Sequence, residues 1–304
     1  MAYRTLSDIN KSVASDVESF IESAEEGFDG SVSSLVERFV SDCDCDIVLL
    51  AGPSSSGKTT TAGKIVEKIN RSGRNAYTLS LDDYYHNAAD IPMTDKGVRD
   101  FENVSALDID LIHKTFSDLI ENRKAMVPEF DFVSGTRKSE MRSIELKKND
   151  VIIVEGLHAL NPIITKGLDE SHIYKVYISV SSRVTDDDGK VIFSKRNLRL
   201  VRRMIRDYHY RNTSVEKTFS QWPEVLKGED KYIFPYEKNA RFRIDSFHPY
   251  ESSIFRDEAV ELLDTVDNAS CFYPLAQQLK EDFSRLRPID ISKMPDDSLL
   301  REFI

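Results

Sequence analysis

The stretch Gly52-Pro53-Ser54-Ser55-Ser56-Gly57-Lys58-Thr59 decides the fold, because it fits the pattern G-x-x-x-x-G-K-[ST] of a phosphate-binding loop. Its flanks have the required order. Residues 47–51 are all apolar and predict a buried parallel strand. From Thr60 onward the apolar residues recur at helical spacing (Ala62, Ile65, Val66 and Ile69). The sequence therefore predicts a strand, a loop and a helix that bind a nucleotide; the alternative is an ordinary glycine-serine turn.

Each part of this loop has a chemical role in such a site. The glycines let the backbone curl, so that successive N–H groups and the helix N-terminus point at an anion. We expect Lys58 to reach the terminal phosphates and Thr59 to ligate magnesium. The predicted nucleotide-binding residues are Gly52, Pro53, Ser54, Ser55, Ser56, Gly57, Lys58, Thr59 and Thr60.

The composition is that of a globular protein with one large domain, or one domain and an appendage. The chain has 304 residues, of which 40% are hydrophobic, enough to fill a core. The 52 acidic and 41 basic residues give a formal charge of −11, which disfavours nucleic acid as a partner, because its phosphates would be repelled. The sequence shows neither an apolar stretch of membrane-helix length nor a signal peptide, so we expect a cytoplasmic protein without a membrane partner.

The three cysteines are Cys43, Cys45 and Cys271. The first two form a C-x-C pair without a second pair at zinc-binding spacing, and the odd count does not suit a disulfide framework. We therefore expect reduced thiols.

The chain is expected to divide into three segments. In residues 1–45, apolar residues at helical spacing are interrupted at Gly27 to Gly30, and a second short helix is expected from Ser31 to Val40. We expect this N-terminal helical appendage to pack as a hairpin on the main domain; the alternative is a surface that binds a partner or forms a homo-oligomer. Residues 46–267 are the expected P-loop domain, and residues 268–304 a helical segment docked on it.

An acidic pair, Asp82-Asp83, follows the second predicted strand (residues 76–81) and precedes Tyr84-Tyr85. Because ligands of doubly wound sheets bind at the carboxyl ends of strands, the pair is expected to face the phosphate loop. A carboxylate in that place can accept a proton from an attacking hydroxyl or hold magnesium, and Asp82 is our choice for both roles. Otherwise these acids cap the next helix or lie in solvent.

Glu155 directly follows the buried strand predicted at residues 151–154. A carboxylate after such a strand is the Walker B arrangement, which binds magnesium directly or through water, opposite Thr59. A surface residue at the end of a strand is the alternative. The predicted metal ligands are Thr59, Asp82 and Glu155.

Seven basic residues lie between Lys195 and Arg211, after a further strand predicted at residues 173–180. On a helix, four of them share one sector (Arg199, Arg202, Arg203 and Arg206). Such a face suits a triphosphate and could close as a lid, at about residues 181–213, over the transferred phosphoryl group. The alternative is a solvated basic face. Residues 186–189 are expected to form a hairpin turn.

In their order, these motifs resemble those of the uridine kinase and phosphoribulokinase family of P-loop kinases, in particular the bacterial uridine kinase-like nucleoside kinases. The resemblance covers about residues 46–267 and implies an α/β fold with a doubly wound, mostly parallel sheet. The matching stretches are residues 52–60, 82–85, 106–108, 128–132, 134–138, 155–156 and Arg202-Arg203-x-x-Arg206-Asp207. Residues 298–304 also look like the end of long bacterial members, whose large N-terminal extension is expected to be absent here.

The resemblance implies roles for residues that the patterns alone do not assign. Asp82 is the catalytic base near magnesium, Tyr85 contacts the nucleoside, and Glu102 holds the ribose hydroxyls in place of the family's Asp. The implied catalytic residues are Asp82, Lys58, Arg203 and Arg206. The implied substrate-binding residues are Tyr85, Glu102, Phe130, Arg137, Arg203, Arg206 and Arg211.

Two departures bear on the acceptor. Phe130 and Gly135 stand where animal uridine-cytidine kinases have a Tyr and a His that help to read the base. Losing those polar groups should relax or change the base preference, because a site that reads by hydrogen bonds discriminates strongly. Trp222 could stack on a base, but we expect it to be part of the core.

The resemblance implies a kinase that transfers the γ-phosphoryl group of ATP or GTP to the 5'-hydroxyl of a pyrimidine nucleoside, with Mg²⁺. Two alternatives stay open. The acceptor could be another small alcohol, such as a sugar phosphate or pantothenate. The chain could instead be a nucleotide-sensing interaction protein without turnover.

Overall fold

The computed structural model describes residues 4–42, 45–93, 97, 99–132 and 134–304. At its centre is a five-stranded sheet in the order β12-β9-β2-β8-β3, in which every neighbouring pair is parallel. The strands are β2 (Ile47–Ala51), β3 (Ala76–Ser80), β8 (Val151–Glu155), β9 (Ile173–Ser179) and β12 (Phe242–Asp245). The predicted α/β fold with a parallel sheet is confirmed.

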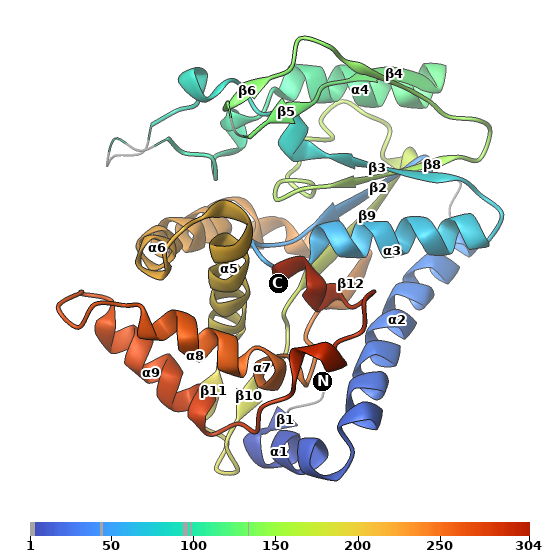
Figure 1. The fold of residues 1–304 in the computed structure, drawn as a ribbon. Coiled ribbons are helices and arrows are strands. Elements are labelled where there is room, and N and C mark those ends of the chain that lie inside the picture. Colours follow the sequence, from blue (N-terminus) through green and yellow to red (C-terminus); the bar gives the residue numbers. More distant parts are fainter. Residues whose placement is uncertain (1–3, 43–44, 94–96, 98, 133) are drawn as a thin grey trace.

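Side chains of β2 enter two different cores, because successive residues of a strand point to opposite faces. Val48 and Leu50 belong to one buried cluster with residues of α2 (Val17–Asp42) and α3 (Lys58–Arg71). Ile47 and Leu49 belong to a second cluster with residues of α4 (Ile109–Asn122). Helices therefore cover both faces of the sheet (Figure 1), as a doubly wound fold requires.

Short elements beside β3 form the part of the molecule that contains the predicted acceptor-binding residues Tyr85, Glu102, Phe130 and Arg137, here called the acceptor side. Strands β4 (Lys124–Val127) and β7 (Arg142–Glu145) form one antiparallel pair, and β5 (Phe130–Asp131) and β6 (Thr136–Arg137) form another. Between β3 and α4 the chain makes three short 3-10 turns, Leu81–Tyr84, Ala88–Asp90 and Val104–Ala106.

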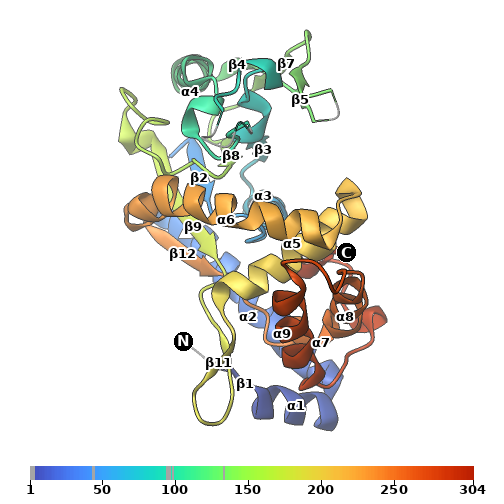
Figure 2. The ribbon, with the colours of Figure 1, turned by 90° about the vertical axis from the view of Figure 1, so that its left-hand side faces the viewer.

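The segment after β9 begins with the hairpin of β10 (Val184–Thr185) and β11 (Val191–Phe193), which confirms the turn predicted at residues 186–189. Strand β1 (Arg4–Thr5) joins β10 in parallel. Next come α5 (Lys195–Arg211) and α6 (Val215–Tyr232), which cross the molecule between the acceptor side and the C-terminal helices (Figure 2). Trp222 of α6 is buried, as predicted for a core residue.

The N-terminal helices differ from the prediction. After α1 (Leu6–Ser15), α2 runs unbroken through Gly27 and Gly30, so the predicted interruption and the separate helix from Ser31 to Val40 are wrong. The break lies at Asp16, whose carboxylate accepts hydrogen bonds from the N–H and the hydroxyl of Ser19 at 3.0 and 2.8 Å. A helical glycine costs about 0.5–1 kcal/mol, less than the burial of neighbours such as Phe28 contributes.

Replacing Gly27 or Gly30 by alanine is expected to stabilise the protein. Both glycines are exposed, and an added Cβ at either one meets nothing within 4 Å. Because alanine loses less backbone entropy on folding, each substitution should raise the free energy of unfolding by about 0.5–1 kcal/mol, measured by urea denaturation. The control is Gly228→Ala in α6, where a Cβ would lie 2.6 Å from Cβ of Glu102 and should destabilise the protein. A loss of stability at Gly27 or Gly30 would contradict a continuous α2.

The C-terminal part contains α7 (Glu251–Ile254), α8 (Arg256–Asp264) and α9 (Tyr273–Ser284), followed by 3-10 turns at Ile291–Lys293 and Leu299–Phe303. The helix predicted after residue 268 is confirmed as α9. Its buried Leu279 and Phe283 belong to the same cluster as Ile9 of α1 and Phe39 of α2, so both ends of the chain share one core with the sheet. The division into residues 1–45, 46–267 and 268–304 stays a prediction.

Two further expectations concern cysteines and membranes. Cys45 is disulfide-bonded, so the prediction of reduced thiols is wrong for this residue. Cys271 is an exposed free thiol, and Cys43 lies outside the described residues. Within the described part of the chain, no helix combines the length and hydropathy that a membrane span requires.

Candidate active site

Two positions of the loop between β2 and α3 favour glycine, one because of a close contact and one because of its backbone conformation. A Cβ on Gly52 would lie 2.2 Å from the carbonyl oxygen of Ile178. Gly57 has a φ of 84° and caps the N-terminus of α3. Ser55 also has a positive φ, 57°. A left-handed turn before a helix directs successive N–H groups to one side, which is the form of an anion-binding nest.

The residues that follow the loop place polar groups at the N-terminus of α3. The Lys58 ammonium donates a hydrogen bond to the carbonyl oxygen of Pro53 at 3.3 Å, so it folds back over the loop. Thr59 is exposed in the first turn of α3. Thr60 donates from its N–H and its hydroxyl to the carboxylate of Glu302, at 3.1 and 2.8 Å. This helix N-terminus therefore already holds an anionic group.

Asp82 and Glu155 lie at the carboxyl ends of neighbouring strands. β3 and β8 pair in a register that sets Ser80 beside Glu155, and the Ser80 hydroxyl donates to Glu155 Oε1 at 2.8 Å. The same hydroxyl oxygen accepts from the N–H of Asp82 at 3.3 Å, in the turn that follows β3. Ser80 thus ties both acidic residues to one edge of the sheet.

The pKa values of these two acids are raised. Burial raises the pKa of Glu155 to about 7; the charge of Asp82 also raises it, and Lys58 opposes the shift. Burial also raises the pKa of Asp82, against the lowering effects of Lys58, Arg211 and Arg206. The carboxylate of Asp82 therefore lies within the electrostatic reach of cations from both the loop and α5.

This donor set fits a magnesium ion. Mg²⁺ prefers oxygen ligands and compensates the repulsion between two carboxylates such as those of half-buried Asp82 and buried Glu155. The hydroxyl of Thr59 is the third predicted ligand. In the described residues, no group of three or more His, Cys, Asp and Glu side chains could hold a metal alone. That agrees with magnesium sites that rely on one or two carboxylates together with substrate phosphates.

Three arginines of α5 converge on one buried carboxylate. Asp207, whose side chain is 3% exposed, pairs with Arg203 at 3.1 Å, with Arg206 at 2.8 Å and with Arg211 at 3.4 Å. The guanidinium of Arg203 also donates to the hydroxyl of Ser54 at 2.9 Å. The structure therefore brings these three predicted residues together beside the phosphate loop.

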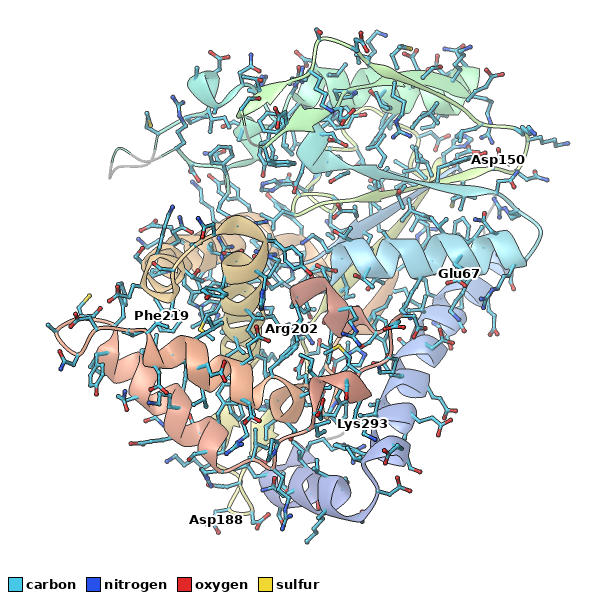
Figure 3. All side chains as sticks on the ribbon, viewed as in Figure 1. Glu67, Asp150, Asp188, Arg202, Phe219 and Lys293 are labelled. Carbon is cyan, nitrogen blue, oxygen red and sulfur yellow. The ribbon has the colours of Figure 1, made fainter. Side chains whose placement is uncertain are left out.

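Arg199 and Arg202 do not belong to that group, and the prediction that all four arginines form one phosphate-facing surface is wrong for them. Arg199 pairs with buried Glu229 at 2.7 Å, and Arg202 pairs with buried Glu251 at 2.8 Å. Arg202 lies in the interior (Figure 3) and is 0% exposed. Arg199 also donates a hydrogen bond to the carbonyl oxygen of Ser54 at 3.0 Å, and Arg202 donates one to the carbonyl oxygen of Ser55 at 3.4 Å. They support the loop from the core side.

Sequence reasoning missed the acids that anchor these arginines. Asp207 carried a local signal, because it is the single acid among the basic residues of α5. Glu229 and Glu251 carried none, since they lie 30 and 49 positions from their partners.

Aromatic rings line the acceptor side. The Tyr85 hydroxyl donates to the carbonyl oxygen of Phe101 at 3.1 Å. The ring centroid of Tyr85 is 5.5 Å from that of Phe101 and 5.9 Å from that of Phe130. Phe132 continues the row, 5.1 Å from Phe130, and is 66% exposed. These four residues form what we call the aromatic row. Its exposed members, Phe101 and Phe132, offer apolar surface to a ligand, whereas Tyr85 and Phe130 are buried beneath them.

Two polar residues, Asp83 and Arg137, connect the aromatic row to the turn that follows β3. The carboxylate of Asp83 accepts from the N–H of Phe130 at 3.1 Å. The guanidinium of Arg137 binds Asp108 at 3.0 Å and the carbonyl oxygens of Tyr84–Tyr85 at 3.2 and 3.0 Å. Arg137 thus positions the turn after β3, and its direct contact with substrate stays a prediction.

Glu102 directly follows Phe101 of the aromatic row, and the side chain of His158 interacts with the backbone of Glu102. Glu102 Oε2 is buried without a hydrogen-bond partner in the described residues, and burial raises the pKa of this carboxyl to about 7 against the charge of Arg203. Burial lowers the pKa of His158 to about 4, so the imidazole is neutral. A buried acceptor oxygen without a partner fits a site for a ligand hydroxyl.

The raised pKa of Glu102 predicts a pH-dependent contribution to stability. Its ordinary pKa is 4.5 and its folded pKa is about 7, so the folded protein binds this proton more tightly. The contribution is fully present below about pH 4.5 and is lost as pH rises through about 7. Glu102→Gln should flatten the pH dependence of the free energy of unfolding in this window by roughly 1–3 kcal/mol, measured by urea denaturation. Glu121→Gln, on the exposed side of α4, controls for the loss of one charge; an unchanged profile for Glu102→Gln would contradict the prediction.

Comparisons with known proteins show which proteins the chain is similar to. A solved structure of a possible uridine kinase from Bacillus stearothermophilus aligns with a TM-score of 0.48 and 18% identity, over 71% of this chain and 98% of that one. The uridine kinase of Staphylococcus haemolyticus is 32% identical over 195 residues, 64% of this chain and 84% of that protein. The uridine kinase of Ureaplasma urealyticum is 28% identical over 200 residues, 65% of this chain and 86% of that protein. The model of the Phosphoribulokinase / Uridine kinase family matches residues 47–249. The resemblance of the motifs is thus confirmed, and the chain belongs to the phosphoribulokinase and uridine kinase family of kinases.

Proposed function

We propose that the chain transfers the γ-phosphoryl group of ATP or GTP to the 5'-hydroxyl of a pyrimidine nucleoside, with Mg²⁺. The observation that carries the proposal is the position of Asp82, which Ser80 ties to Glu155 at one edge of the sheet. Its carboxylate lies within electrostatic reach of Lys58 of the loop and of Arg206 and Arg211 of α5. A carboxylate near both groups of cations stands where a donor phosphate and an acceptor hydroxyl would meet. The relatives named uridine kinases support a nucleoside as the acceptor.

The donor half of the site would be built from the loop and α5. The loop amides and Lys58 would hold the β- and γ-phosphates, and Thr59 and Glu155 would hold magnesium. The metal would neutralise charge on the phosphate oxygens. Arg203 and Arg206, already oriented by Asp207, would stabilise the charge that spreads over the transferred group.

The transfer itself needs one proton acceptor. The 5'-oxygen bonds to the γ-phosphorus, the bond from that phosphorus to the bridging oxygen breaks, and the nucleoside diphosphate leaves. Asp82 takes the proton of the hydroxyl. Because burial raises the pKa of Asp82, its carboxylate is a stronger base than one in solvent.

The acceptor half fits a nucleoside better than a smaller alcohol. The aromatic row would stack on a planar base, which neither a sugar phosphate nor pantothenate contains. The unpartnered oxygen of Glu102 would accept hydrogen bonds from ribose hydroxyls.

The same side offers little to distinguish one base from another. Phe130 has no polar group, and Gly135 has a φ of 68°, with an added Cβ only 3.1 Å from Cβ of Ala88. The turn of the β5–β6 hairpin therefore favours glycine and leaves no side chain to read the base. We propose that uridine and cytidine are both accepted, because discrimination without hydrogen bonds is weak.

A panel of acceptors with radiolabelled ATP and Mg²⁺ tests the proposal. It would contain uridine, cytidine, adenosine, ribulose 5-phosphate and pantothenate. We expect phosphorylation of the pyrimidine nucleosides at similar kcat/KM values. Phosphorylation of the sugar phosphate or pantothenate alone would overturn the proposed acceptor. ATP binding without turnover of any acceptor would favour a nucleotide-sensing protein.

The proposal also bears on location and partners. Because the donor is an intracellular nucleotide, we place the protein in the cytoplasm. Its net charge of −11 gives no general affinity for nucleic acid. A homo-oligomer stays a prediction, which the mass in solution would test.

A further inference from the structure

A carboxylate from the far end of the sequence lies on the phosphate loop. Glu302 belongs to residues Ser298–Ile304, here called the tail segment. One of its oxygens, Oε2, accepts hydrogen bonds from both the N–H and the hydroxyl of Thr60, at 3.1 and 2.8 Å. The described residues give Glu302 no cationic partner. Its negative charge is therefore stabilised by the N-terminus of α3.

The donors that Glu302 uses are donors that a bound nucleotide needs. In a phosphate loop, the N–H groups around the start of the helix hold the α- and β-phosphates. Thr60 is the third residue of α3 and the last residue of the predicted nucleotide-binding segment. A phosphate oxygen and a carboxylate oxygen are both acceptors, so they compete for the same two donors, and their charges repel.

Apolar residues hold the tail segment against the loop. Leu299, Leu300 and Phe303 are all 0% exposed. Leu299 lies against the backbone of Gly57, where an added Cβ would be 2.5 Å from Cδ1 of the leucine. The guanidinium of Arg202 lies 5.2 Å from the ring centroid of Phe303. Because these residues anchor the segment, the carboxylate of Glu302 can leave α3 by rotating its own side chain.

We propose that Glu302 is an autoinhibitory contact: its carboxylate occupies the α-phosphate subsite at Thr60 and must leave when a nucleotide binds. This rests on the proposed donor site. Only molecules in which Glu302 has left Thr60 can bind the nucleotide with all its contacts. The apparent Kd therefore equals the intrinsic Kd divided by the fraction of such molecules. The tail segment thereby sets the nucleotide concentration at which the enzyme becomes occupied.

Calorimetric titration of the full chain with Mg·ADP tests this inference. Glu302→Ala should lower the Kd about tenfold, the order that hydrogen bonds to a charged group contribute. Glu302→Gln keeps an acceptor oxygen without the charge and should lower the Kd by a smaller factor. The matched control is Asp296→Asn, just before the tail segment, whose side chain is fully exposed and pairs with Arg301 at 3.5 Å. This substitution also removes one negative charge, but at a position away from the loop, so it should leave the Kd for Mg·ADP unchanged.

Each outcome decides between an inhibitory contact and a helix cap. If Glu302→Ala binds Mg·ADP no more tightly but unfolds at a lower temperature, Glu302 only caps α3 and the inference is overturned. Weaker binding would make Glu302 part of the nucleotide site and would also overturn it. If the alanine variant does not fold, the nearly isosteric glutamine variant carries the test. Absence of Mg·ADP binding in every protein would overturn the donor site as well, whereas failure of the acceptor panel alone would leave this inference standing.

Discussion

Replacing Asp82 by asparagine is expected to lower the kcat for nucleoside phosphorylation by about 10²–10⁴-fold, the range for loss of a general base. Asparagine keeps the shape of the side chain but cannot take the proton of the 5'-hydroxyl. The loop and Lys58, which would hold the phosphates, are unchanged, so the Kd for ATP should stay close to that of the unaltered protein. Steady-state kinetics and calorimetry measure the two quantities separately.

The neighbouring acid gives a control of the same size and charge. Asp83→Asn weakens the hydrogen bond that holds the N–H of Phe130, so it should raise the KM for the acceptor more than it lowers kcat. If Asp82→Asn turns over at nearly the unaltered rate, Asp82 is not the proton acceptor.

The largest effect on stability is expected from Arg202→Met. Arg202 and Glu251 are 0% and 1% exposed, and the substitution leaves the carboxylate of Glu251 buried without its cation. Removing one partner of a buried ion pair lowers the free energy of unfolding by about 3–5 kcal/mol. Urea denaturation should show a loss of this order, and the double variant Arg202→Met/Glu251→Leu should recover much of it, because no charge is then buried.

A surface ion pair between α5 and α6 provides the comparison. Arg196 is 46% exposed and pairs with Asp230 at 2.7 Å. Arg196→Met should cost at most about 1 kcal/mol, the value of an exposed pair. If Arg202→Met weakened ATP binding without loss of stability, Arg202 would face the nucleotide after all.

The parts of the fold and site that could be predicted depend on neighbouring residues. The strand at 47–51, the loop and α3 follow one another in the sequence, and Glu155 is the last residue of β8. The helical spacing of the arginines also predicted α5. Parallel strands then bring Asp82 and Glu155 to one edge, because their carboxyl ends meet there.

What could not be predicted depends on contacts between distant residues. Helical spacing placed Arg199 and Arg202 on the same face as Arg203, but Glu229 and Glu251 lie on other elements and draw both into the core. Gly27 and Gly30 are locally unfavourable in a helix, yet the packing of Phe28 and Val32 keeps α2 continuous. Nothing in the sequence near Thr60 indicates that Glu302 lies against it.

The contact between Thr60 and Glu302 also has a consequence for folding kinetics. The two residues are separated by 242 positions, so their meeting closes one of the longest loops that this chain offers. Long-range closure carries a large entropic penalty and raises contact order, which slows folding. The sheet and the loop can form from residues closer together, whereas the packing of Leu299 on Gly57 has to wait for that closure. The tail segment is therefore expected to dock in a late step, and molecules that have not reached it present the phosphate loop without Glu302.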